Sequence, residues 1–223
     1  MPAFTTTVKT VWILLCSLAP PVVPSPLCAG APGCPVMSLA NLFDRVIQHS
    51  ARMHGISSDL HQEFEQQLVP SRNHIGRVSR TCHTSSILTP TDKENAQRMT
   101  REELTEVILK LLVAWTDPLW HFQQRLKHQN DLNLSEDKAE QVGRMVHELH
   151  SGVQKMAQKM QMLGMIGNFV SGLSSPDPQT PPDSSEWHQL QSSDLLHCLR
   201  RDSNKVLNYL KILKCRIVPQ HGC

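Results

Sequence analysis

Apolar side chains recur at spacings of three and four residues in four long segments, which is the period of an amphipathic α-helix. A capping-box pattern at Thr100 and Glu103 marks the start of the second segment, and Pro118 is expected to kink it. The four predicted helices cover residues 38–68, residues 100 to about 127, residues 135–163 and residues 192–217. This pattern predicts an all-α protein.

The connections between these segments differ greatly in length. A few polar residues at 128–134 join the second and third segments, so we expect these two helices to be antiparallel neighbours. The other two connections, residues 69–99 and 164–191, are each about thirty residues long and can run the length of a bundle. They favour an up-up-down-down four-helix bundle with two long crossovers, the long-chain cytokine type. The alternative, a simple up-down bundle, normally has short loops throughout.

The N-terminus has the pattern of a secretory signal peptide. Lys9 precedes a short apolar run from Val11 to Ala19, and small residues and prolines follow. The run is too short to cross a bilayer, and no later stretch is long and apolar enough to anchor the chain in a membrane. We predict a signal peptide over residues 1–25, cleaved between positions 19 and 25, and one secreted helical domain over residues 26–223. The alternative is a buried N-terminal helix.

The cysteine count agrees with secretion. Of seven cysteines, Cys16 lies in the predicted signal peptide, which leaves an even six for disulfides. Cys198 and Cys215 lie on one predicted helix, about 25 Å apart, and cannot bond to each other. The first two remaining cysteines flank a turn-rich loop, and the last can fold back from just beyond the fourth helix. Elimination then predicts the pairs Cys28–Cys34, Cys82–Cys198 and Cys215–Cys223.

Charge and motifs exclude several classes of function. The net charge is only +2, which does not favour nucleic acid as a partner. The sequence has no GxSxG, P-loop or GxGxxG motif and no HExxH pattern, so we predict neither an enzyme nor a bound cofactor or metal. The twelve histidines fit surface positions on amphipathic helices. Asn133 begins an Asn-Leu-Ser sequon, which makes it a possible N-glycosylation site.

Two features of the predicted helices suggest binding surfaces. The fourth helix opposes its apolar stripe with a basic face that includes Arg200, Arg201, Lys205 and Lys211. Such a face is either a protein-binding surface or an ordinary solvated one. Gly152 interrupts the third helix, where glycine costs about 1 kcal/mol relative to alanine. It either permits close approach of another backbone or is merely tolerated.

Several stretches resemble the prolactins of the prolactin/growth hormone family. Residues 82–97 resemble the prolactin first crossover, and residues 195–217 resemble its fourth helix; residues 42–45 and 115–119 also match. The pair Cys28 and Cys34 is similar to that of tetrapod-type prolactins and is lacking in growth hormones. The disulfide pairing of the family agrees with the pairing obtained by elimination.

The resemblance implies a secreted, monomeric hormone that brings together two chains of a single-pass class I cytokine receptor of the prolactin-receptor type. Janus kinase/STAT signalling would follow. The stronger face would use His54, Arg200, Arg201, Lys205, Tyr209 and Lys211. The weaker face would centre on Gly152, whose missing side chain leaves room for the second receptor.

The sequence also departs from the prolactin pattern. Some prolactins bridge to their receptor through zinc held by histidine and aspartate, and three of those positions here are Ala51, Asn204 and Leu207. Of the zinc-bridging positions only His54 remains, so the departures argue against zinc-assisted receptor binding and favour a divergent paralogue with its own receptor preference. An alternative function is a secreted carrier of lipid or another apolar ligand, suggested by the methionine-rich third helix.

Overall fold

The computed structural model describes residues 37–68, 82–128, 136–167 and 185–220, and these residues form helices with no strand. The helices are α2 (Leu39–Leu68), η2 (His83–Ser86), α3 (Lys93–Arg98), α4 (Arg101–Ala114), α5 (Thr116–His128), α6 (Glu136–Met162) and α7 (Ser185–Ile217). The predicted all-α fold is confirmed. The predicted signal peptide, the sequon at Asn133 and the pair Cys28 and Cys34 lie outside the described residues.

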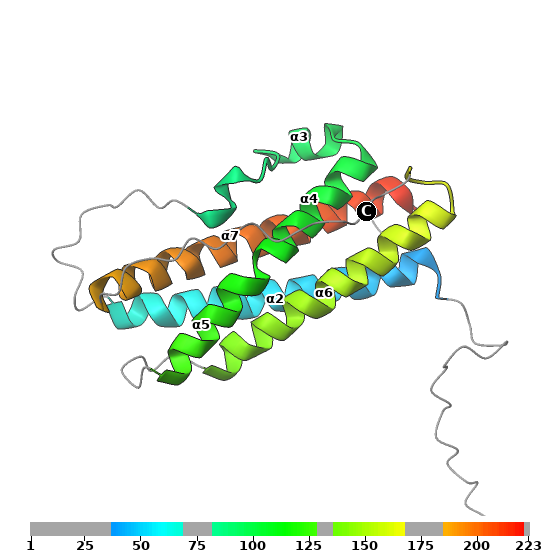
Figure 1. The fold of residues 1–223 in the computed structure, drawn as a ribbon. Coiled ribbons are helices and arrows are strands. Elements are labelled where there is room, and N and C mark those ends of the chain that lie inside the picture. The colour runs from blue at the N-terminus through cyan, green and yellow to red at the C-terminus, as the bar shows by residue number, and fades with distance from the viewer. Residues whose placement is uncertain (1–36, 69–81, 129–135, 168–184, 221–223) are drawn as a thin grey trace, which may run out of the picture. The chain divides into compact units, whose positions relative to one another are not determined.

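Contacts between helices give the direction of each one. Asp44, near the start of α2, forms an ion pair of 2.8 Å with Lys214 near the end of α7. Arg101, at the start of α4, donates to the carbonyl of Arg216 at 3.0 Å. Both α2 and α4 are therefore antiparallel to α7, and so parallel to each other, as the colour gradient in Figure 1 also shows.

The third long helix, α6, runs in the same direction as α7. Its first turns meet the end of α2, where Lys138 contacts Glu63, and its later turns meet the start of α2, where Gly152 faces Val46. The order is therefore up-up-down-down, with α2 and α4–α5 opposed to α6 and α7 (Figure 1). The two long crossovers predicted from the sequence make this order possible.

A single aliphatic core lies between the four helices. Three of the few aromatic residues, Phe43, Phe64 and Phe122, are fully buried in this core. Each buried side chain of this size contributes about 1.5–3 kcal/mol relative to an exposed one. The methionines Met145, Met156 and Met160 of α6 belong to the same core.

The second predicted helix is interrupted three residues before its proline. Helix α4 ends at Ala114, and α5 starts at Thr116. Pro118 has no N–H to donate to the Ala114 carbonyl four residues earlier, so the hydrogen-bond ladder fails there. The freed carbonyl is 3.1 Å from Nε2 of His83 in the first crossover. The break is therefore compensated by a side chain from another part of the chain.

The start of the fourth helix was predicted too late. Helix α7 begins at Ser185, seven residues before the expected position. Residues 185–191 contain neither glycine nor proline, so the helix can extend upstream although its apolar stripe begins only at Leu196. The prolines at 181 and 182 lie just before this start.

The long-range disulfide predicted by elimination is confirmed. Cys82 is bonded to Cys198, with a Cα–Cα distance of 5.7 Å and a sequence separation of 116. Cys215 is also disulfide-bonded, and its predicted partner, Cys223, lies outside the described residues. The first bond attaches the first crossover to α7.

The Cys82–Cys198 bond restricts a long loop in the unfolded chain. Replacing both residues by alanine should lower the free energy of unfolding by about 4–5 kcal/mol, measured by guanidinium denaturation under oxidising conditions. Met162→Ala, at an exposed site on α6, is the control and should leave stability nearly unchanged. A double variant as stable as the parent protein would show that the bond does not constrain the chain in this way.

Candidate functional site

Residues 82–98 of the first crossover, here called the strap, lie along α7 (Figure 1). The disulfide fixes one end of the strap, and two hydrogen bonds fix its middle. Lys205 Nζ donates to Thr89 Oγ1 at 2.8 Å, and Tyr209 Oη donates to the carbonyl of Pro90 at 3.1 Å. The surface of this side of the bundle is therefore made by α7 and the strap together.

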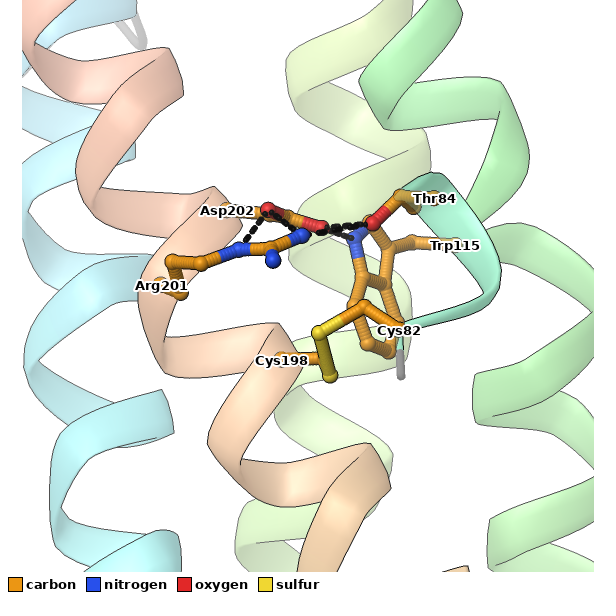
Figure 2. Close-up of a disulfide and its surroundings, with 6 residues drawn as sticks. All are labelled: Cys82, Thr84, Trp115, Cys198, Arg201 and Asp202. Carbon is orange, nitrogen blue, oxygen red and sulfur yellow. Dashed lines mark hydrogen bonds and ion pairs between the residues drawn. A yellow bond between two sulfur atoms is a disulfide. The ribbon is translucent and has the colours of Figure 1, made fainter. Parts of the chain in front are cut away.

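A buried carboxylate lies beside the disulfide, as Figure 2 shows. Asp202 is 0% exposed, and its Oδ2 accepts from Thr84 Oγ1 at 2.6 Å and from Trp115 Nε1 at 3.2 Å. Its Oδ1 accepts from Nε of Arg201 at 2.8 Å. A buried charge is tolerated only when it is compensated in this way. The donors come from the strap, the α4–α5 junction and α7, so satisfying Asp202 fixes the three relative to one another.

His83 strengthens the same junction. Although much of this residue is accessible, its ring lies edge-on to Trp115 with the centroids 4.5 Å apart, and its Nε2 meets the Ala114 carbonyl. Burial lowers the pKa of His83, and the hydrogen bond to Ala114 opposes this only in part. The neutral imidazole is therefore the form that the fold favours.

Three residues predicted for the stronger face lie together on the α2–α7 side. Arg200 and Lys211 are exposed on α7, and both charges act on His54 of α2. Burial lowers the pKa of His54, and these two cations lower it further. His54 Nδ1 is 2.9 Å from Ser203 Oγ, a hydroxyl that donates to the Arg200 carbonyl. His54 is therefore the donor in a bond between α2 and α7.

The other three predicted residues of that face hold the strap. Arg201 is partly buried, and its Nη2 donates to Thr84 Oγ1 at 2.9 Å in addition to the bond with Asp202. Lys205 is engaged with Thr89, and burial lowers the pKa of Lys205. Tyr209 is only 5% exposed, and burial raises its pKa to about 12. These side chains shape the surface more than they project from it.

The basic face was predicted from the helical period, which did not reveal the contribution of the strap. Asp202 lies four residues after Cys198, so the two share a face of α7, and that spacing was a usable signal that Asp202 meets the crossover. Leu88 of the strap was also missed. It is 89% exposed between residues that are tied to α7, and no periodicity could identify it.

Two of the three positions that depart from the zinc-bridging pattern, Ala51 and Leu207, have no side-chain atom that could bind a metal. Ala51 and Asn204 are exposed near His54 on α2 and α7, whereas Leu207 is buried in the bundle. Neither alanine nor leucine can coordinate a metal.

Gly152 of α6 lies at the seam between α6 and α2. A Cβ atom built on Gly152 would lie 3.3 Å from Cγ2 of Val46, closer than most such contacts. One turn earlier, Nε2 of His49 approaches the Met145 carbonyl at 3.2 Å and Glu148 Oε2 at 3.5 Å. The absence of a side chain at Gly152 therefore lets the two helices approach closely at this seam.

Four packed helices in up-up-down-down order, joined by two long crossovers, are the architecture of the long-chain helical cytokines. A model of the somatotropin hormone family matches residues 12–223, and the chain belongs to that family. Its members are secreted hormones, not enzymes, that act through class I cytokine receptors. Among the helices that the structure describes, none has the length and apolar character to cross a membrane.

The Asp202 network should be sensitive to loss of its charge. Asp202→Asn replaces an acceptor by an NH₂ group that faces other donors, so we expect the free energy of unfolding to fall by about 3 kcal/mol in denaturant titrations. Asp44→Asn is the matched control, because Asp44 is exposed and its ion pair should contribute less than about 1 kcal/mol. Equal effects of the two substitutions would contradict the role given to Asp202.

The lowered pKa of His83 makes stability depend on pH. Between its folded pKa and about 6.5, the unfolded chain binds more protons than the folded chain, so stability falls as the pH falls through that window. His83→Gln keeps a donor for Ala114 without titrating, and should flatten the curve of unfolding free energy between pH 7 and pH 5. His147→Gln, at an exposed site on α6, is the control. An unchanged curve for His83→Gln would rule out this source of acid sensitivity.

Proposed function

We propose that this chain is a secreted hormone of the prolactin type that brings together two chains of a class I cytokine receptor of the prolactin-receptor type. Residues 1–25 would be removed as a signal peptide, and residues 26–223 would form the hormone. Janus kinases attached to the paired receptor chains would then activate STAT signalling. The prolactin-like stretches at residues 82–97 and 195–217 support this assignment within the family.

The observation that carries the proposal is the clustering of His54, Arg200 and Lys211 on the α2–α7 side of the bundle. Exposed cations on a surface that is already held rigid lose little conformational freedom on binding. They favour a receptor surface with carboxylates, which would accelerate encounter and fix the orientation of docking. This surface is the candidate for the first, stronger receptor contact.

The second contact is assigned to the α2–α6 seam at Gly152. The seam is a different side of α2, so a second receptor chain could bind there without displacing the first. A seam that carries no side chain at Gly152 allows a partner backbone to approach. The proposal therefore needs one hormone with two unlike faces.

The methionine-rich helix α6, which suggested an apolar carrier, has another explanation. Met145, Met156 and Met160, three of the four methionines of α6, fill the core between the helices as part of one cluster with α2, α4 and α7, whereas Met162 is exposed. Their flexible side chains have a packing role that needs no ligand.

Removing a cation of the first face should weaken the first contact. Lys211→Ala should reduce the affinity for one immobilised receptor ectodomain by about five- to tenfold, a typical loss for an interface charge, as measured by surface plasmon resonance. Lys127→Ala, an exposed lysine on α5, is the matched control. Unchanged affinity for Lys211→Ala would remove this residue from the contact.

A large side chain at Gly152 should separate receptor binding from signalling. Gly152→Arg should bind the first receptor with normal affinity and fail to induce STAT phosphorylation in receptor-bearing cells. Gly167→Arg is the control, because a Cβ there meets no atom within 4 Å. Signalling of normal potency by Gly152→Arg would refute the two-face mechanism.

A further inference from the structure

An exposed tryptophan lies beside α6, where this helix packs against α5. Trp120 on α5 is 55% exposed, although tryptophan is among the side chains with the most apolar surface to bury. It borders a shallow groove of about 340 Å³ between α5 and α6, whose exposed lining is mostly apolar. Thr116 and Gln123 line the groove from α5, and Gly143, Arg144 and Glu148 line it from α6.

The groove is built by a close approach of the two helices. Gly143 has no side chain, and a Cβ there would lie 2.1 Å from Nε2 of Gln123. That amide instead lies flat across Gly143 and donates to the Ala139 carbonyl at 3.1 Å. The floor of the groove is therefore held in place by a partly buried hydrogen bond, while the indole of Trp120 remains accessible at its edge.

The charges around the groove are already paired within the protein. Arg144 Nη1 contacts Glu140 Oε1 at 2.8 Å, and Glu148 Oε2 lies 3.5 Å from Nε2 of His49. A charged ligand would have to compete with these pairs. An apolar, uncharged group fits the groove better, because it would bury the indole and leave the ion pairs at the rim.

Glu148 connects this groove to the α2–α6 seam. It lines the groove on one side of α6, contacts His49 of α2 on the other, and lies one turn before Gly152. The groove and Gly152 are thus the two ends of one strip that crosses the outer surface of α6. A receptor contact of ordinary size would cover both.

We propose that Trp120 and its groove are the aromatic anchor of the second receptor contact, and that the second receptor chain inserts an apolar side chain there while it covers Gly152. This inference rests on the proposed function, since it assigns a further part of the same weaker face. Tryptophan is strongly enriched among the residues that dominate binding energy. A contact centred on a glycine otherwise lacks such a residue.

The test uses the folded full-length hormone and a soluble ectodomain of the prolactin-receptor type, with the first and second binding steps measured separately by surface plasmon resonance and mass photometry. Trp120→Ala should leave the first step unchanged and weaken the second about tenfold. Thr116→Arg should have a similar effect, because it fills the groove from an exposed position without removing Trp120. Met162→Ala, an exposed apolar truncation at the end of α6, should leave both steps unchanged.

The possible failures can be told apart. If the parent hormone forms no complex with two receptor chains, the proposed function fails and this inference fails with it. If that complex forms and both groove variants bind the second chain within twofold of the parent, the inference alone is overturned. It is also overturned if Trp120→Ala changes only the self-association of the hormone, because the groove would then bind a second copy.

Discussion

The structure depends most on one buried charge, the carboxylate of Asp202. A carboxylate with no exposed surface must receive hydrogen bonds from every side, and here the donors are Thr84, Trp115 and Arg201. They come from three separate parts of the chain, so the strap, the α4–α5 junction and α7 can satisfy the charge only in one arrangement. The disulfide beside the network connects two of the same parts, and it acts on the unfolded chain as well as on the folded one.

This constraint divides the basic face of α7 into two sets of residues. Arg201, Lys205 and Tyr209 are used to hold the strap, whereas Arg200 and Lys211 remain exposed near His54. A surface formed in this way is rigid before any partner arrives, which lowers the entropic cost of binding. On α6, by contrast, the packing depends on missing side chains, since Gly143 and Gly152 let this helix lie close to α5 and α2.

The sequence was sufficient for what depends on local pattern and chain length. Helical period predicted the four helices, connection length predicted their order, and the rise along one helix left Cys82 as the partner of Cys198. It was insufficient where tertiary contacts decide. Pro118 leaves the Ala114 carbonyl without a donor, but the sequence did not show that His83 of the strap meets it. Tyr209 is buried because the strap covers it. A helical wheel contains no information about what packs on a helix from outside.

The central claim is that the strap and α7 form one rigid surface that receives the first receptor chain. Hydrogen–deuterium exchange of the hormone, alone and with a single receptor ectodomain, tests it most directly. The account predicts that binding slows exchange in residues 84–96 and in residues 200–211 together, with α5 and α6 unaffected until a second ectodomain is added. Slower exchange confined to α5 and α6 on binding of the first ectodomain would contradict it.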